Sequence, residues 1–415
     1  MNAGGPGSGR TGLHARWWTV AALLIPAVIR CSFLQVDQVF EAHTMALDLL
    51  ATGQFGHHYF GSWDRCFQFP VYTTLLAVIY GLGGGAAVAL WFQVACGTVV
   101  AYLAMRLVQH LLHGRPTARA MSLVAAWVVG LDPFLAYYQV RMVHPFAWDM
   151  LLATALLFMA LTVRSEQRLE LILFFALGGL AVLNRPTLGV FMFPFILRHP
   201  RYFLRPDKVL LKSWLLVLLF GPIACWVLRN HALTGRAQLT SVTDQMLWMG
   251  QQEETEGGGY QKDGTTYLHL LSIPERHRMF TADPAERSWL FRAKWRAERE
   301  SEPGLAWRMF AVKWRNFWWS RSSIGQDHAA SPPWAMQLYR VHAALLLLLF
   351  VASLFLGDRR VWYIGLSALL LSVAQCVYYF ETRHRLLIDP VLIALALVFL
   401  SRIGERIPRI GRSLQ

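Results

Sequence analysis

Long apolar segments recur along almost the whole chain, separated by short basic or polar stretches. They lie at about 17–34, 70–82, 86–105, 120–140, 146–163, 169–183, 187–197, 210–228, 338–356, 361–380 and 386–401. A helix that spans the hydrocarbon core of a membrane needs about 20 mostly apolar residues. The segment 70–82 is shorter and stops at the glycines Gly83 to Gly85, which indicates an interfacial or re-entrant helix. The pattern predicts an all-α polytopic membrane protein with about 10 transmembrane helices.

The composition supports a membrane protein. Hydrophobic residues make up 55% of the 415 residues and charged residues only 15%, whereas a soluble protein carries about 25% charged residues. The 17 tryptophans fit the aromatic belts at membrane surfaces. The chain has a net charge of +14. Lys and Arg collect in the cytoplasmic loops of membrane proteins, which explains such an excess of positive charge. Because no nucleic-acid-binding motif is present, we expect no nucleic-acid partner.

The basic stretches predict the topology. They lie at 106–119, 164–168, 198–212, 359–360 and in the tail 402–412. If the segment 70–82 does not cross, all of them fall on one side, which the positive-inside rule assigns to the cytoplasm. The first apolar run is too long for a signal peptide and no cleavage site follows it, so we expect an uncleaved helix. Both chain ends are then cytoplasmic.

Three parts are expected. Residues 1–228 form an N-terminal transmembrane region that includes a first outer loop, 35–85. Residues 229–336 are too long and too rich in charged and aromatic residues for a plain loop, and they predict a small, mostly helical external subdomain. Residues 337–415 supply the last transmembrane helices and a basic cytoplasmic tail.

Several polar patches are expected at the outer membrane surface. Asp37 follows the first helix and is the candidate catalytic base, although an ordinary solvated loop carboxylate has the same pattern. Glu41 lies one helical turn later and could share its face. His144 and Asp149 begin a later segment, and Glu41, His144 or Asp149 could act as a second acid or its replacement. A lone histidine in such a place is more often structural.

A cluster of arginines is expected at the same level. Arg383 and Arg385 precede the last apolar segment, and the planar guanidinium suits phosphate. Interfacial snorkelling is the alternative reading. Arg141 and Arg185 add further cations. Asp132 lies inside an apolar segment, where a carboxylate is costly unless it faces the bundle or a water-filled cleft.

Other chemistry finds little support in the sequence. The five cysteines are scattered and lack metal-ligand spacing. Neither an H-E-x-x-H pattern nor a phosphate loop is present. The sequence thus offers no recognisable metal-binding pattern.

A series of loose motifs points to a family. They are Arg30, Asp37, Ala46, Leu50 and Gly53; Phe69-Pro70-Val71-Tyr72; Gly179 to Pro186; Trp226, Arg229, Asn230, Gly235 and Gly250; Lys313 and Trp318; and Glu381, Arg383, Arg385 and Pro390. In this order and spacing they resemble polytopic glycosyltransferases of the GT-C class, in the bacterial branch of family 39 near protein O-mannosyltransferases and lipid A aminoarabinose transferases. The match extends over most of the chain.

The resemblance implies a function. It implies transfer of a sugar from a polyprenyl-phosphate donor to an envelope glycan, lipid or protein acceptor, with inversion, at the outer face of the bacterial inner membrane. Asp37 would be the base, and Arg383, Arg385 and Arg185 would hold the donor phosphate. The resemblance also implies a pocket that contains Tyr72, Arg141, Arg229 and Asn230. Because the nearer relatives need no divalent metal, the resemblance implies no metal and no cofactor. The sequence departs from the family at Gln38, where an acid is usual, and at His144.

Two other functions fit parts of the sequence. A secondary transporter or lipid flippase would account for the intramembrane Asp132, although we see no internal repeat. An inactive relative that binds a lipid-linked sugar would account for Gln38 and His144.

Overall fold

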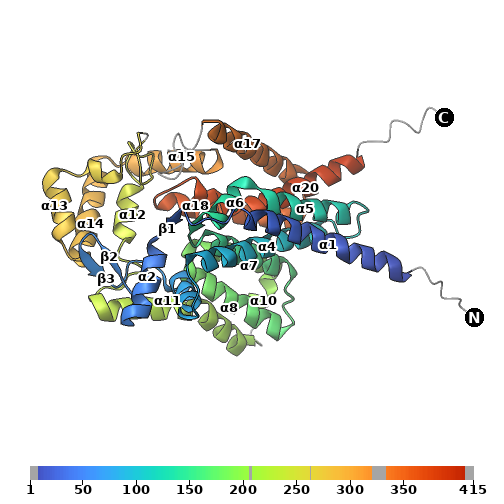
Figure 1. Ribbon diagram of the computed structural model, residues 1–415, viewed down its shortest axis with the longest axis horizontal. Coiled ribbons are helices and arrows are strands. Elements are labelled where there is room, and N and C mark those ends of the chain that lie inside the picture. The colour runs from blue at the N-terminus through green and yellow to red at the C-terminus, as the bar shows by residue number, and fades with distance from the viewer. Residues whose placement is uncertain (1–7, 205–207, 262, 320–332, 407–415) are drawn as a thin grey trace, which may run out of the picture.

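The computed structural model describes residues 8–204, 208–261, 263–319 and 333–406. The apolar segments and the short connections between them form the helices α1 (Ser8–Cys31), α4 (Ala86–Leu111), α5 (Ala118–Leu131), α6 (Pro133–Val140), α7 (Phe146–Thr162), α8 (Arg168–Asn184), η1 (Pro186–Met192), α9 (Phe193–Arg198), α10 (Pro200–Leu204), α11 (Val209–Thr234), α17 (Pro333–Leu356), α18 (Arg359–Val377), α19 (Arg383–Leu386) and α20 (Asp389–Arg406). They form one bundle that fills the right-hand part of Figure 1. The tail beyond Arg406 lies outside the described residues.

Four helices are long and apolar enough to cross a membrane: α4, α11, α17 and α18. A fifth span results if α5 and α6 count as one, although they meet at an angle of 50°. The described chain is thus all-α, with the helices of a membrane protein, but the expected ten full spans are not found in it. The difference arises where proline interrupts an apolar run, as at Pro133 and Pro186, and where α7 and α8 have only 17 residues each.

The last helix lies at the centre of the bundle. Every residue from His384 to Val398 is buried, and α20 packs against α4, α5 and α17. The helices α8 and α11 approach closely at Gly179, where an added Cβ would lie 2.1 Å from the carbonyl oxygen of Leu218. This contact gives a structural reason for the glycine in the Gly179 to Pro186 motif.

The first outer loop folds into short elements. They are β1 (Gln38–Val39), α2 (Glu41–Thr52), the antiparallel hairpin of β2 (His57–Tyr59) and β3 (Ser62–Asp64), and α3 (Pro70–Gly81). The expected short helix at 70–82 is confirmed: α3 has 12 residues, a length of about 18 Å, too short to span a membrane. The strand β1 pairs in parallel with β4 (Met142–Val143), which connects this loop to the start of α7.

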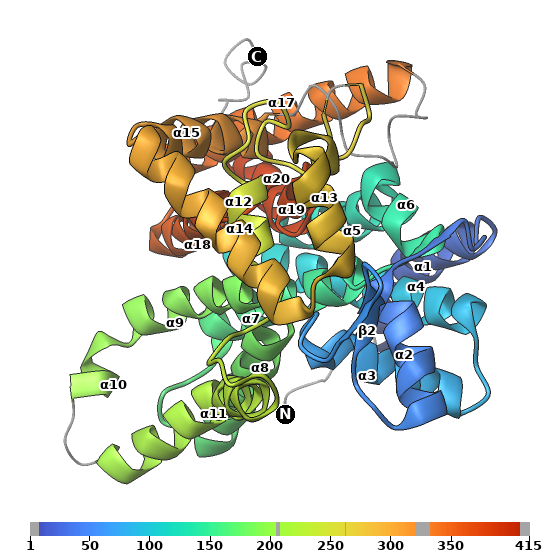
Figure 2. The ribbon, with the colours of Figure 1, turned by 90° about the vertical axis from the view of Figure 1, so that its left-hand side faces the viewer.

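The external segment is mostly helical, as expected. It contains α12 (Thr243–Met249), η3 (Tyr267–Leu270), α13 (Ile273–Thr281), α14 (Pro284–Ser301) and α15 (Leu305–Trp318). Its core includes Trp248, Met279 and Phe291 and packs against Phe60 of the first loop. The helix α11 runs six residues past the expected boundary at 228, to Thr234. Figure 2, which looks onto this end, shows α12 to α14 in front of the bundle.

The two ends of the described bundle share one side. In Figure 1 the beginning of α1 and the end of α20 lie at the right, whereas α12, α13 and α14 lie at the left. The cavity described below is lined in part by α12 and so lies toward the end of the molecule opposite to these two ends of the bundle.

Candidate functional site

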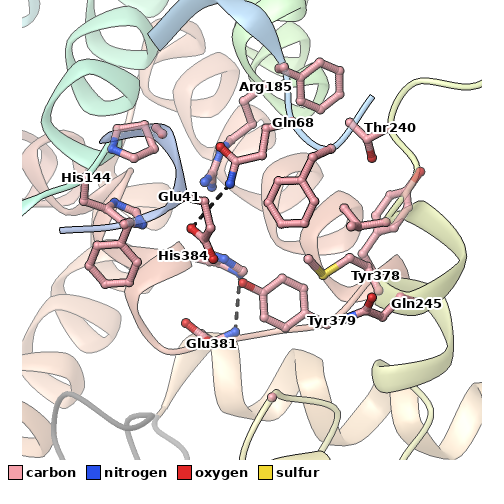
Figure 3. A pocket seen from close by; sticks show the side chains of 18 of the residues that line it. Glu41, Gln68, His144, Arg185, Thr240, Gln245, Tyr378, Tyr379, Glu381 and His384 are labelled. Atoms are coloured by element: carbon pink, nitrogen blue, oxygen red, sulfur yellow. Dashed lines mark hydrogen bonds between the residues drawn. The ribbon is translucent and has the colours of Figure 1, made fainter. Parts of the chain in front are cut away.

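A cavity of about 780 Å³ lies where the first loop, the external segment and the bundle meet. This volume is within the range of small-molecule sites, about 300–1,000 Å³. Its lining is contributed by α2 and the loop before α3, the start of α7, the turn after α8, the segment 239–267 and the turn after α18. Residues separated by more than 300 positions thus share one wall, as Figure 3 shows for Glu41 and Glu381.

Glu41 points into the middle of this cavity (Figure 3). It is the first residue of α2, a position where the helix dipole favours a negative charge. The amide nitrogen of Gln68 donates a weak hydrogen bond to its carboxylate at 3.5 Å. Glu41 has no cationic partner among the residues that the structure describes. The carboxylate is therefore available to a ligand.

Asp37 lies outside the cavity lining. Its carboxylate accepts from the Nε of Arg141 at 2.6 Å, and about 30% of each side chain is exposed (29% and 31%). The guanidinium of Arg141 also donates to the side chain of Gln35 at 3.0 Å. The structure thus joins Asp37 and Arg141 in an ion pair between the first loop and the end of α6, rather than placing them in the cavity with Glu41.

Gln93 holds the backbone that leads to the cavity. This side chain of α4 is fully buried. Its Nε2 donates to the carbonyl oxygen of Met142 at 2.7 Å, and its Oε1 accepts from the Tyr72 hydroxyl at 2.7 Å and from the His144 amide at 3.0 Å. The strand β4 pairs with β1, which ends two residues before Glu41. By holding the backbone at β4, Gln93 therefore also positions β1 and the start of α2.

His144 lines the cavity and is almost fully buried. Its Nδ1 accepts from the Phe146 amide at 3.2 Å, and its ring packs edge-on against Phe40 at 4.8 Å. Burial, together with the nearby positive charges of Arg383 and Arg185, holds the pKa of His144 well below its usual range. The imidazole is therefore neutral at pH 7, so it cannot supply a positive charge to an anionic ligand.

Two of the predicted arginines reach the cavity. Arg185 lies 3.0 Å from the buried carboxylate of Asp149, which also accepts from Asn184 at 2.5 Å. Arg383 pairs with Glu381 at 2.6 Å and lies over the ring of Phe40, 5.7 Å from its centre. The carboxylates fix both guanidinium groups in place. Asp149 acts in the structure as the partner of Arg185.

Arg385 does not reach the cavity. It is fully buried, 3.2 Å from Asp389, and it donates to the carbonyl oxygens of Trp318 and Ala343 at 3.4 Å. Only His384 separates it from Arg383 on the short helix α19, so the two side chains leave the helix in different directions. The structure therefore separates two neighbouring arginines that the sequence suggests as a pair.

Of the other three residues expected in the pocket, one lines the cavity and two lie behind or beside its wall. Tyr72 lines the cavity, but Arg229 and Asn230 do not. Asn230 is buried and donates to the carbonyl oxygens of Gln238 and Leu239 at 3.1 and 3.0 Å, and so it holds the backbone of the cavity wall at Leu239. Arg229 donates to the Arg65 carbonyl oxygen at 2.9 Å.

Asp132 faces the bundle. It accepts from the amides of Phe134 and Leu135 at 2.9 and 3.0 Å, at the start of α6, and lies 3.1 Å from the imidazole of His342. The structure therefore gives this carboxylate a capping role at the bend between α5 and α6.

The sequence analysis did not identify several residues of the site. They are Gln68, Gln93, Tyr59, Gln245, Tyr267, Tyr379 and His384. They are isolated polar or aromatic residues in loops and helices, and no spacing rule marks them. Lys313, noted in the sequence, is buried and donates to the Tyr378 carbonyl oxygen at 2.8 Å, while burial lowers the pKa of its ammonium to about 8.

Comparison with known proteins identifies no relative in the families and curated proteins that were compared. The chain matches no model of a known protein family, and no curated protein matches it significantly. In the part of the chain that the structure describes, no group of three or more His, Cys, Asp or Glu residues is placed to hold a metal ion.

The Gln93 network leads to a test of stability. Gln93→Leu leaves the amide of His144 and the hydroxyl of Tyr72 buried without their partner, which we expect to destabilise the protein by about 3 kcal/mol. Thermal unfolding of the purified protein in detergent measures this loss. Unfolding is monitored through the labelling of the thiols of Cys66, Cys96 and Cys376, which are buried in the folded protein. The matched control is Gln54→Leu, at an exposed glutamine. Equal unfolding midpoints for the two variants would contradict the role of Gln93.

Proposed function

We propose that this protein is a membrane glycosyltransferase that moves a sugar from a polyprenyl-phosphate donor to an envelope acceptor. The observation that carries the proposal is the charge arrangement in the cavity. Glu41 faces the cavity with no cationic partner among the described residues, while Arg185 and Arg383 line the same cavity from other elements. The motif series in the sequence supports the same class of enzyme.

The chemistry follows from this arrangement. An acceptor hydroxyl attacks the anomeric carbon, and its proton passes to the Glu41 carboxylate, which acts as general base. The bond between the anomeric carbon and the phosphate oxygen breaks, and the phosphate leaves with the electron pair. Attack from the face opposite to the phosphate inverts the anomeric carbon. The leaving group is already a stable anion, so it needs positive charge rather than a proton.

The guanidinium groups supply that positive charge. Arg383 and Arg185 are oriented by Glu381 and Asp149 before a ligand binds, and fixed donors cost no reorganisation when charge develops. Arg385 takes no part in donor binding in this proposal, because Asp389 and two carbonyl oxygens occupy its guanidinium. Its task is to hold α19 against α20 and α17.

The base in this proposal is Glu41, which the sequence suggests only as a possible second acid. Asp37, the base expected from the sequence, acts here as a positioning residue. The ion pair of Asp37 with Arg141 joins the first loop to the end of α6, next to the strand pair β1–β4. We further propose that the cavity faces the outside of a bacterial inner membrane, with both chain ends in the cytoplasm, and that the shorter apolar helices complete about ten crossings.

A transporter is the second candidate, and the ionisable groups within the bundle are the observation that favours it. Asp132, His342 and Asp389 lie among membrane helices, where ionisable residues often mark transport pathways. Movement of a labelled lipid-linked sugar across proteoliposomes, without formation of a new glycosidic bond, would favour this candidate over the transferase.

The roles of Glu41 and Asp37 can be separated by substitution. Glu41→Gln keeps the shape of the side chain and removes the base, so we expect transfer to fall about 10²- to 10⁴-fold. The rate of sugar transfer is measured in membranes that contain the variant. The membranes are supplied with labelled polyprenyl-phosphate sugar and cell-envelope acceptor. Asp48→Asn, on the same helix and outside the cavity lining, is the matched control. Asp37→Asn should lose less than Glu41→Gln, and the reverse order would assign the base to Asp37.

Substitution of the two neighbouring arginines, Arg383 and Arg385, should have different effects. Arg383→Gln should lower kcat/KM for the donor about 10²-fold, because one donor to the developing phosphate charge is lost, while the protein stays folded. Arg385→Gln leaves Asp389 buried without its cation, which costs about 3–5 kcal/mol and should lower the yield of folded protein. Arg383→Gln also leaves the Glu381 carboxylate without its cation. The double variant Glu381→Gln with Arg383→Gln removes that unpaired charge and is the control. Equal transfer by Arg383→Gln and the wild-type protein would remove Arg383 from the site.

A further inference from the structure

The wall of the cavity on the external side is uncharged. Apart from two histidines, five ionisable charged residues line the cavity, and they are Glu41, Asp149, Arg185, Glu381 and Arg383. They come from α2, α7, the turns after α8 and α18, and the start of α19. The lining residues from 59–69 and from 239–267 are neutral, with aromatic, amide, hydroxyl, thioether or aliphatic side chains.

This neutrality does not follow from the composition of the external segment, which contains many charged residues. Asp244 illustrates the point, because it lies between Thr243 and Gln245, which both line the cavity. Its carboxylate turns away and accepts from Arg292 at 2.9 Å and from Ser288 at 2.5 Å on α14. Charge is thus directed outward, and neutral groups are left facing the cavity.

The neutral wall is a built surface rather than a set of mobile side chains. The Nε2 of Gln245 donates to the hydroxyls of Tyr59 and Tyr267 at 2.8 and 2.6 Å. The ring of Tyr59 packs against Phe67 with 4.5 Å between their centres. Gln245 and Tyr267 are both at least nine-tenths buried, with 5% and 9% of their surface exposed. These contacts fix the orientation of two aromatic rings and an amide before a ligand arrives.

This wall lies within reach of Glu41. In Figure 3, Glu41 lies between His144 on one side and Gln245, Thr240 and Tyr378 on the other. Burial raises the pKa of the Tyr59 hydroxyl, and the negative charge of Glu41 adds to that increase. Arg383 and Arg185 lie near His144, on the other side of Glu41 from Gln245. A hydroxyl group held on the neutral wall would thus face the carboxylate, and a phosphate on the side of His144 would meet the two guanidinium groups.

We propose that this neutral wall is the acceptor subsite and that it binds an uncharged saccharide, so that the acceptor is a glycan. The inference rests on the proposed transferase function. Aromatic faces and fixed amide or hydroxyl groups suit the apolar faces and hydroxyls of a sugar ring. A phosphorylated lipid head group would require cations, and this wall presents none among the described residues.

The test measures binding separately from transfer. The full chain in lipid nanodiscs is mixed with uncharged mannotriose or chitotriose, a Ser/Thr-rich peptide, or a diphosphorylated glucosamine lipid, and binding is followed by saturation-transfer NMR. We expect the trisaccharide to bind. Tyr260 is a further tyrosine of the neutral wall. Gln245→Met and Tyr260→Leu should each weaken that binding about tenfold, the effect of losing a hydrogen bond and a packing face. Gln261→Leu, at a glutamine outside the lining, is the matched control and should bind as the wild-type protein does.

Each outcome has a distinct meaning. Preferential binding of the peptide or the phosphorylated lipid would overturn the inference and leave the transferase proposal intact. Unchanged trisaccharide binding by both Gln245→Met and Tyr260→Leu, with thermal stability retained, would also overturn it. Trisaccharide binding that depends on Gln245, without any sugar transfer from the labelled donor, would support the saccharide subsite and contradict the proposed transferase.

Discussion

The parallel pairing of Gln38 and Val39 with Met142 and Val143 is the interaction on which the cavity depends. Two strands of two residues each supply too few hydrogen bonds to be stable alone. The pair persists because the buried amide of Gln93 binds the backbone on one side of it. The start of α2 is therefore placed by a polar side chain of a membrane helix, and so is Glu41.

The second constraint is the cost of burying charge. An unpaired guanidinium in a low-dielectric site is strongly unfavourable, so cations near the bundle need carboxylate partners. Arg185, Arg383 and Arg385 each have one, in Asp149, Glu381 and Asp389. The same pairing fixes two of these guanidinium groups at the cavity and the third within the bundle. Glu41 differs because its contact within the described residues is the amide of Gln68.

Hydrophobic periodicity and charge predict the class of fold, the short helix α3 and the helical external segment. They do not predict the number of full spans, because a run of apolar residues looks the same whether its helix is continuous or bends at Asp132. The sequence predicts that Arg185, Arg383 and Tyr72 share a site, and they line one cavity. It does not distinguish Arg383 from Arg385, or Glu41 from Asp37, because side-chain direction in a loop is set by tertiary contacts such as Arg141 with Asp37.

The orientation of two carboxylates is the central claim, and an experimental structure tests it most directly. Cryo-electron microscopy of the full chain in nanodiscs, with a polyprenyl-phosphate sugar bound, would show which side chain faces the anomeric carbon. The account predicts Glu41 beside the sugar, Arg383 on the phosphate, and Asp37 still paired with Arg141. A structure in which Asp37 has left Arg141 and contacts the sugar, with Glu41 turned away, would contradict it.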